Sequence, residues 1–215
     1  MNFPDPLIRG TLIKRYKRFL TDVELENGDV VVAHCANPGS MLSLLEEGAE
    51  VWLSPARNPK RKLKYTWEMI RLGDTLVGLN TSLPNAIVEE AIENDLIPEL
   101  KGYETLRREV KYGKNSRIDI LLESLGVPIC YVEIKSVTMS RSNLMSEKHE
   151  NLAEFPDSVT ARGAKHLQEL SDQVADGKRA MMLYLVQRED CDRFAVAADI
   201  DPTYAAALLK AKKAG

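Results

Sequence analysis

The stretch CYVEIKSV, residues 130–137, has the composition of a buried strand and yet carries two opposite charges. Residues two apart on a strand share a face, so Tyr131, Glu133 and Lys135 point one way and the intervening aliphatic residues point the other. Charged side chains are seldom fully buried unless they are paired. The stretch therefore predicts a core strand whose charged face has a specific partner.

The preceding strand, RIDILLES at residues 117–124, supplies a candidate partner. If the two strands form a hairpin that is symmetric about Gly126, Asp119 lies opposite Glu133, with β-carbons ~5 Å apart. Two carboxylates so close repel each other, and burial strengthens the repulsion. We therefore expect a cation between them.

A divalent ion satisfies this arrangement better than one lysine. Mg²⁺ is held by one or two carboxylates, keeps several waters and accepts phosphate oxygens as further ligands. We predict a Mg²⁺ site between Asp119 and Glu133, with Lys135 orienting a water or meeting a phosphate. Asp119, Glu133 and Lys135 are then the catalytic residues of a phosphodiester-cleaving site. The alternative is that Glu133 and Lys135 form a solvated ion pair on the surface of the sheet.

The second part of the chain predicts an α/β domain over residues 81–215. Helical spacing at 85–95 is followed by three strand candidates, at 105–112, 117–124 and 128–137. The polar stretch at 138–158 is predicted to be a loop, and residues 159–177 are predicted to form a helix. The apolar run 180–187 predicts a buried strand. The order is α-β-β-β-α-β, and its β-α-β crossover predicts that the strands at 128–137 and 180–187 are parallel. A further strand at 193–197 and a helix at 203–214 complete the domain.

The first part, residues 1–80, predicts a five-stranded barrel of the OB type. Strand-like segments alternate with turns, and Asn27-Gly28 marks a hairpin. Residues 41–48 predict one or two helical turns between strands. Of the aromatic residues, Trp67 or Tyr65 could stack on nucleic-acid bases, whereas Trp52 is expected in the core.

Basic residues cluster although the net charge is −3. Such clusters are usually solvated surface, but several of them together favour a phosphate-backbone partner. The predicted nucleic-acid-binding residues are Lys14, Arg15, Lys17, Arg18, Arg57, Lys60, Arg61, Lys62, Lys64, Arg117, Arg162 and Lys165.

The combination Asp119, Glu133-x-Lys135 resembles the PD-(D/E)XK nuclease superfamily, whose core is α-β-β-β-α-β. More specifically, the chain resembles the sugar fermentation stimulation protein A family, in segments that span nearly its whole length. They include PLIRGTLIKRYKRFLTDVELENG, AHCANPGSM, SRIDILLE, YVEIKSVT and FPDSVTARGAKHLQEL. The resemblance implies an N-terminal OB-like domain, a C-terminal nuclease-like domain and DNA binding. Together with the facing carboxylates, it implies that the carbonyl of Ile134 joins Asp119 and Glu133 as a third ligand of Mg²⁺ or Mn²⁺. In nuclease-like folds a glutamate of the first helix often joins the metal site, which here implies Glu90; a solvated helix face is the alternative.

We therefore predict a DNA-binding protein with a divalent-metal-dependent nuclease site, acting on DNA that could be single-stranded or branched. The alternative is a non-catalytic DNA-binding regulator that retains the fold. With no apolar run long enough to cross a bilayer and no signal peptide, a cytoplasmic location is expected. The oligomeric state stays open, a homodimer being one option.

Overall fold

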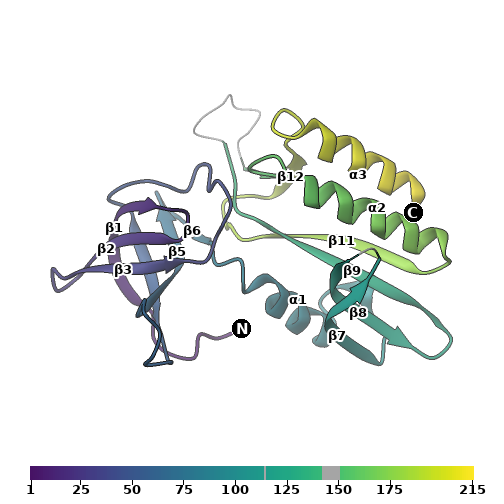
Figure 1. The fold of residues 1–215 in the computed structure, drawn as a ribbon, viewed down its shortest axis with the longest axis horizontal. Helices are drawn as coiled ribbons and strands as arrows, with labels where there is room; N and C mark the ends of the chain where they lie inside the picture. The colour runs from purple at the N-terminus through teal and green to yellow at the C-terminus, as the bar shows by residue number, and fades with distance from the viewer. Residues whose placement is uncertain (114, 142–150) are drawn as a thin grey trace.

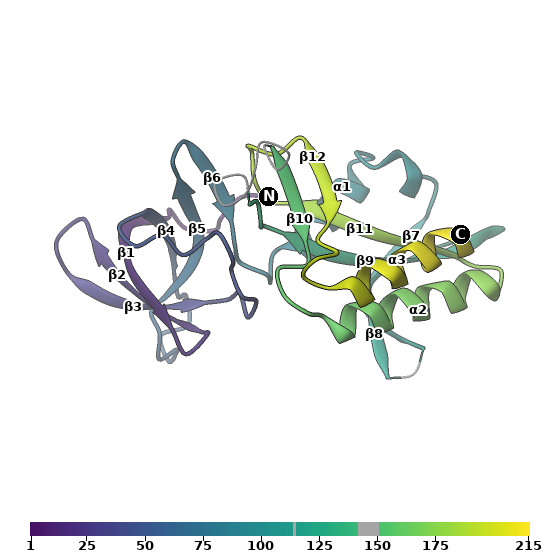
Figure 2. The ribbon, with the colours of Figure 1, turned by 90° about the horizontal axis from the view of Figure 1, so that it is seen from above.

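A computed structural model describes residues 1–113, 115–141 and 151–215 of the chain, which fold into two lobes (Figure 1). The first lobe is built from strands and the second from a sheet with helices, as Figure 2 shows from a perpendicular direction. Among the described residues, no helix is long and apolar enough to cross a membrane.

The first lobe is a closed barrel with one added strand. The sheet has the order β3-β2-β1-β4-β5-β6, and parallel pairing of β3 with β5 closes β1 to β5 into a five-stranded barrel. This confirms the predicted OB-type barrel. Its strands are β1 (Ile8–Tyr16), β2 (Leu20–Leu25), β3 (Val30–Cys35), β4 (Glu50–Pro55), β5 (Tyr65–Leu72) and β6 (Thr75–Gly78).

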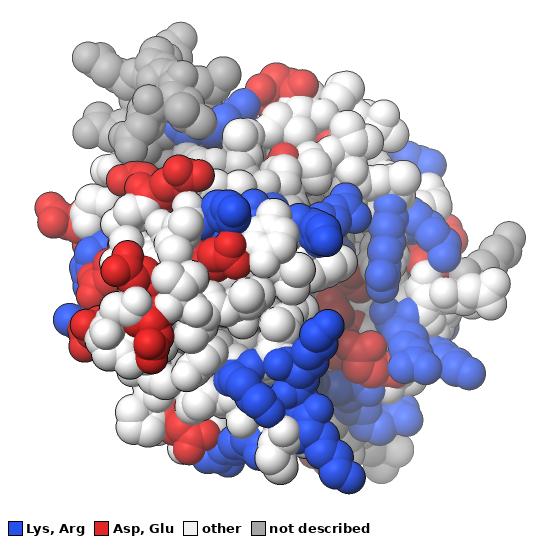
Figure 3. All heavy atoms as spheres, turned by 60° about the vertical axis from the view of Figure 1, so that its left-hand side comes forward, with Lys and Arg blue, Asp and Glu red and all other residues white. Residues whose placement is uncertain are grey.

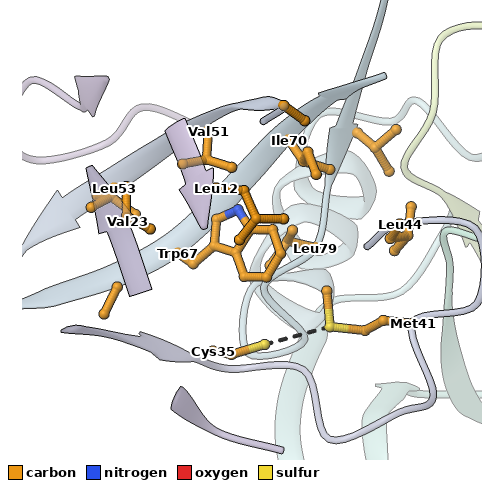
Figure 4. Packing of buried hydrophobic residues seen from close by; sticks show 13 residues of the cluster. Leu12, Val23, Cys35, Met41, Leu44, Val51, Leu53, Trp67, Ile70 and Leu79 are labelled. Atoms are coloured by element: carbon orange, nitrogen blue, oxygen red, sulfur yellow. Dashed lines mark hydrogen bonds between the residues drawn. The ribbon is translucent and has the colours of Figure 1, made fainter. Parts of the chain in front are cut away.

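The two tryptophans lie in surroundings that differ from those predicted for them. Trp67 is fully buried among Leu12, Val51 and Leu79 (Figure 4), and its indole N–H donates to the carbonyl of Met69 at 2.9 Å. It therefore has no free face for a nucleic-acid base, and the stacking role considered for it is wrong.

Trp52 points outward, because its neighbours in β4, Val51 and Leu53, both face the core. The guanidinium groups of Arg9 and Arg71 lie 5.7 Å and 5.2 Å from its ring centroid. The core position expected for Trp52 is wrong.

The helical turns predicted for residues 41–48 are not formed. Met41 and Leu44 are buried at a spacing of three, which imitates a helix, but Met41 and Ser43 have positive φ angles of 55° and 71°. Alternating left-handed residues cannot continue a helix. The segment is a series of turns, and the side chains of Met41 and Leu44 are buried in the barrel core.

The second lobe has a four-stranded sheet of order β11-β9-β8-β7, in which β11 is parallel to β9 and the other pairs are antiparallel. Helix α1 packs on one face of this sheet and α2 on the other, with α3 beside α2 (Figure 2). The predicted α-β-β-β-α-β order and the parallel crossover are confirmed. The elements are α1 (Pro84–Glu93), the 3-10 turn Pro98–Leu100, β7 (Thr105–Tyr112), β8 (Ser116–Ser124), β9 (Val127–Val137), α2 (Ala161–Ala175), β11 (Arg179–Val186) and α3 (Pro202–Ala214).

The predicted loop at 138–158 contains a strand. Residues of β10 (Leu152–Phe155) pair in parallel with β12 (Arg193–Val196) in a small second sheet. Four residues give too short a pattern to be read as a strand, and their partner lies about forty residues further along the chain. Residues 142–150 of the predicted loop lie outside the described residues.

The end of β11 joins the two lobes. The N–H of Gly78 in β6 donates to the carbonyl of Gln187 at 3.0 Å, and Val77 forms a bridge with Arg188. The backbone N–H of Leu76 donates to the carboxylate of Glu189 at 2.9 Å. The barrel is therefore connected by backbone hydrogen bonds to the strand that lies beside β9.

Candidate active site

Beyond its turn, the β8–β9 hairpin has the register that the sequence predicts. At the turn itself Ser124 pairs with Val127, and an irregularity between Leu122 and Ser124 shifts the register, so that Leu122 pairs with Cys130 and Ile120 with Val132. Continuing this register by one residue places Asp119 opposite Glu133. Both side chains border the same cleft between the two lobes.

A third acidic residue lies in the same row. In the β7–β8 ladder, Arg108 pairs with Ile120 and Val110 with Ile118, so Glu109 lies opposite Asp119. Glu109 has a φ of 53°, a left-handed conformation that is unfavourable for a residue other than glycine. Glu109 was not among the site residues predicted from the sequence, because it lies on the polar side of the strand at 105–112, which resembles a solvated face.

Glu133 is held by two donors on one of its oxygens. Its Oε1 accepts from Lys135 Nζ at 2.6 Å and from Nδ1 of His166 on α2. Burial by itself would raise the pKa of Glu133, but hydrogen bonding to His166 and the charge of Lys135 hold that pKa below its ordinary value. The side chain is only 3% exposed, and it is ionised at neutral pH.

The other oxygen of Glu133 defines the chemistry of the site. Oε2 is buried, and no described residue donates a hydrogen bond to it. A buried carboxylate oxygen without a partner is costly, so such an atom requires an explanation. A ligand that enters the cleft would supply the missing partner.

Asp119 is held by both of its neighbouring elements. Its Oδ2 accepts from the backbone N–H of Ile134 at 2.7 Å, and its Oδ1 accepts from Asn85 of α1 at 3.0 Å. Burial, and then the negative charge of Glu133, raise the pKa of Asp119 above its ordinary value. A positive charge between the two carboxylates would remove this unfavourable interaction.

The site residues fit a divalent cation. Asp119 and Glu133 provide two fixed carboxylates, one with an unpartnered oxygen, and Mg²⁺ needs only one or two carboxylates because it keeps waters and takes phosphate oxygens. Within the described ranges, no group of three or more His, Cys, Asp or Glu side chains converges, so a cation held here would need water or phosphate oxygens as its further ligands.

Glu90 does not reach this cleft. Its carboxylate pairs at 2.7 Å with the amino group of Met1, on the exposed side of α1. The residue of α1 that contacts the site is Asn85, one turn nearer the start of the helix. The prediction that Glu90 is a metal ligand is therefore wrong. The neighbour of Asp119 on α1 is Asn85. Glu90 and Asn85 lie more than one helical turn apart, and only the packing of α1 on the sheet decides which of them meets β8.

The barrel contributes a loop to the cleft, which has a volume of about 490 Å³. Asn37, Pro38 and Gly39 line it, opposite the carboxylates. Asp157 of the second lobe holds this loop, because it accepts from Ser40 Oγ at 3.0 Å and from the N–H of Met41 at 3.0 Å. The sequence does not indicate the role of Asp157, because this residue lies 116 positions along the chain from Met41.

Several of the predicted nucleic-acid contacts are engaged within the protein. Arg15 donates to the carbonyls of Arg18, Asn37 and Gly39, so it braces the loop that lines the cleft. Arg57 pairs with Asp5, and Lys14 lies 3.8 Å from Asp22.

Two predicted basic residues lie on α2 beside the cleft. Arg162 lines the cleft, and its Nε donates to Nε2 of His166 at 3.3 Å. Lys165 Nζ donates to Ser116 Oγ at 3.0 Å and lies 3.5 Å from Glu169. Figure 3 shows Lys and Arg side chains on both sides of a recess whose interior carries acidic side chains. The exposed members of the predicted set are Lys14, Lys17, Arg18, Arg57, Lys60, Lys62, Lys64, Arg117, Arg162 and Lys165.

The fold and the site define a two-domain protein, an OB barrel joined to an α/β domain with a nuclease-like core. Residues 13–79 match the family described as "SfsA N-terminal OB domain", and residues 82–215 match "Sugar fermentation stimulation protein RE domain". The chain belongs to the sugar fermentation stimulation protein family.

Relatives cover the whole chain. It is 56% identical over 215 residues to a sugar fermentation stimulation protein homolog of Paramagnetospirillum magneticum, covering 100% of this chain and 88% of the relative. The homolog of Rhodospirillum rubrum is 57% identical over 218 residues, covering 98% and 87%. A solved structure of SfsA from Pyrococcus furiosus in complex with Ca²⁺ has a TM-score of 0.86 and 27% identity, covering 100% of this chain and 87% of that one.

Proposed function

We propose that this protein is a divalent-metal-dependent phosphodiesterase that cleaves DNA. The observation that carries the proposal is the buried, unpartnered Oε2 of Glu133, which borders the same cleft as Asp119. The Ca²⁺ bound by the Pyrococcus furiosus relative supports a cation site in this family. Mg²⁺ or Mn²⁺ is the proposed cofactor, and the cytoplasm is the proposed location.

The residues of the site have separate tasks in this proposal. Asp119 and Glu133 hold the cation, and the carbonyl of Ile134 is the third proposed ligand. When bound, the cation would lower the pKa of a coordinated water and neutralise charge that develops on the phosphoryl group. Lys135 would orient the attacking water beside the phosphate. As the water oxygen bonds to phosphorus, the bond from phosphorus to the leaving sugar oxygen would break; the water would lose one proton to solvent, and the leaving oxygen would take one proton from solvent.

The hydrogen-bond chain behind Glu133 fixes its orientation. Because Nε2 of His166 accepts from Arg162, the ring proton lies on Nδ1 and is donated to Glu133. Lys135 donates to that same oxygen. Oε1 is thereby occupied on the protein side, and Oε2 is the oxygen left for the cation. Partners that orient a ligand in this way strengthen metal binding.

Basic residues on the outer surface of the barrel and beside the cleft bind the DNA backbone in this proposal. Lys17, Arg18, Lys60, Arg61, Lys62 and Lys64 extend from the barrel, and Arg117, Arg162 and Lys165 come from the second lobe. Each phosphate that such a residue neutralises releases counterions, so binding weakens with salt. The alternative function, a DNA-binding regulator without catalysis, would show the same salt dependence.

The test compares cleavage and binding in one variant. Asp119→Asn keeps the shape of the side chain but removes its charge, and we expect cleavage to fall by at least ~100-fold while DNA affinity in EDTA stays within a few-fold. Glu123→Gln on the same strand is the matched control, because Glu123 pairs with exposed Arg107 far from the cleft. Wild-type protein that binds DNA but cuts no single-stranded, duplex or branched substrate with Mg²⁺ or Mn²⁺ would favour the regulator.

A further inference from the structure

An exposed aromatic ring lies on the outer surface of the barrel, away from the residues that line the cleft. Phe19 ends the turn between β1 and β2 and is 44% exposed. Its ring stacks on His34 of β3, with centroids 6.3 Å apart and planes inclined by 21°. A large apolar ring held flat at the surface by a second ring is a preformed stacking surface.

Apolar side chains extend this surface along β3. His34, Val32 and Val30 alternate with inward-facing residues, so they share the outer face. Val30 is 63% exposed and Val32 is 38% exposed. We call Phe19, His34, Val32 and Val30 the stacking face. The stacking face is only one strand wide. A surface this narrow suits a row of bases better than it suits a folded protein partner.

Positive charge borders the stacking face on two sides. Lys17 and Arg18 form the tip of the β1–β2 turn, both in left-handed conformations with φ of 49° and 65°. On the other side, the basic loop 56–64 leads into β5, whose first residue, Tyr65, pairs with Ala33 beside His34. Lys60, Arg61 and Lys62 belong to that loop. The phosphates of nucleotides bound at the stacking face would thus lie near positively charged Lys and Arg side chains.

The stacking face is connected to the cleft through one side chain. Arg15 donates from Nε to the carbonyl of Arg18 in the turn at 2.9 Å. Its Nη2 donates to the carbonyls of Asn37 and Gly39, each at 3.0 Å, and both of these residues line the cleft. Arg15 therefore holds both the turn that carries Phe19 and the loop that lines the cleft.

We propose that the stacking face binds unpaired bases of single-stranded DNA whose backbone continues into the cleft. Each base has a π-face that can stack on an aromatic ring, whereas bases inside a duplex already stack on their neighbours. Within the proposed nuclease function, on which this inference rests, the preferred substrate then carries a single-stranded segment. Lys17 and Arg18 bind the phosphates of the DNA backbone through their charges, and the ring of Phe19 stacks on a base.

The test measures binding to three DNA probes by fluorescence anisotropy in EDTA, so that no cleavage occurs. The probes are a dT oligomer, a strand of the same length in which abasic sites replace the bases, and a duplex. We expect Phe19→Ala to weaken dT binding about tenfold, as for one stacked base, and to leave the other two probes unchanged. Phe19→Tyr keeps the ring and should bind as wild type does.

Leu125→Ala is the matched control, since Leu125 is 95% exposed on the β8–β9 turn in the other lobe. The inference is overturned if Phe19→Ala binds dT as tightly as wild type or weakens all three probes equally. Circular dichroism of Phe19→Ala excludes unfolding as the cause. A wild type that binds dT through Phe19 but never cleaves DNA would defeat the nuclease proposal and leave the stacking face intact.

Discussion

The imidazole of His166 lies against the carboxylate of Glu133, and the two side chains are only 4% and 3% exposed. They come from α2 and β9, so the helix that covers the sheet also orients a predicted metal ligand. Arg162, one turn earlier on α2, donates to the far side of the same imidazole. This chain of contacts makes His166 a positioning residue for Glu133.

His166→Ala should weaken Mn²⁺ binding by ~10–100-fold, the usual cost of losing a partner of a metal ligand. His166→Asn places an amide N–H near the position of Nδ1 and should retain most of the affinity, whereas His166→Gln presents its amide further out and should not. Isothermal titration calorimetry with Mn²⁺ measures all three variants. If His166→Ala binds Mn²⁺ as wild type does, Glu133 needs no orienting partner.

The sequence predicted the parts of this site that depend on strand pairing. The pairing of Leu122 with Cys130 and of Ile120 with Val132 agrees with the predicted register, and with it the placement of Asp119 and Glu133, although the turn itself pairs Ser124 with Val127 and an irregularity in β8 makes up the difference. The pattern also predicted the closed barrel and the α-β-β-β-α-β order. These features depend on neighbouring residues in the chain.

The missed features depend on contacts between distant segments. Glu90 and Asn85 are both polar residues of α1, and only its packing decides which approaches Asp119. Asp157 meets the barrel loop across 116 residues of chain. Trp52 and Trp67 are equally apolar, and the direction of each strand residue, not its type, places one outside and one in the core.

The contact between Gly39 and Asp157 leaves no room for a side chain. A β-carbon at Gly39 would lie 2.9 Å from Oδ2 of Asp157 and 3.0 Å from the side-chain oxygen of Asn37. Gly39→Ala should therefore displace Asp157 and lower the free energy of unfolding by about 1–3 kcal/mol. Urea titration measures the loss.

A double-mutant cycle identifies its cause. In an Asp157→Ala background the obstructing carboxylate is gone, so the added cost of Gly39→Ala should fall well below its cost in wild type. Equal costs in the two backgrounds would show that Asp157 is not what excludes a side chain at residue 39.

A buried ion network lies behind the cleft. The guanidinium of Arg141 donates to both oxygens of Glu154 and to Asp199. Arg141 and Glu154 are nearly inaccessible, whereas Asp199 is largely exposed. Arg141→Met would leave Glu154 as an unpaired buried carboxylate, so we expect a loss of about 3–5 kcal/mol in the free energy of unfolding.

Two variants separate the members of this network. Arg141→Met together with Glu154→Gln removes the buried charge and should recover much of the stability, because the cost comes from the uncompensated carboxylate. Asp199→Asn should cost about 1 kcal/mol or less, as expected for an exposed partner. Chemical denaturation compares all of them, and an Asp199→Asn loss as large as that of Arg141→Met would contradict this assignment.

The junction between the lobes should weaken in acid. Asp190 accepts from Arg188 at 2.9 Å and 2.8 Å, and Arg188 also donates to the carbonyl of Thr138 at 3.0 Å. Burial alone would raise the pKa of Asp190, but the hydrogen bonds and charge of Arg188 hold that pKa below its ordinary value of 3.8. Since the folded pKa is depressed, this pair contributes stability above pH 3.8 that is lost as the pH falls through the folded pKa.

Asp190→Asn should therefore destabilise the protein at pH 7, and the difference from wild type should shrink as the pH is lowered below about 4, where the wild-type unfolded chain begins to take up the proton. Urea denaturation at a series of pH values measures this difference. Asp192→Asn is the matched control, because Asp192 is exposed and two residues away, and its difference from wild type should be small throughout. A constant difference between Asp190→Asn and wild type down to pH 3 would show that the carboxylate charge of Asp190 does not hold Arg188 at the junction.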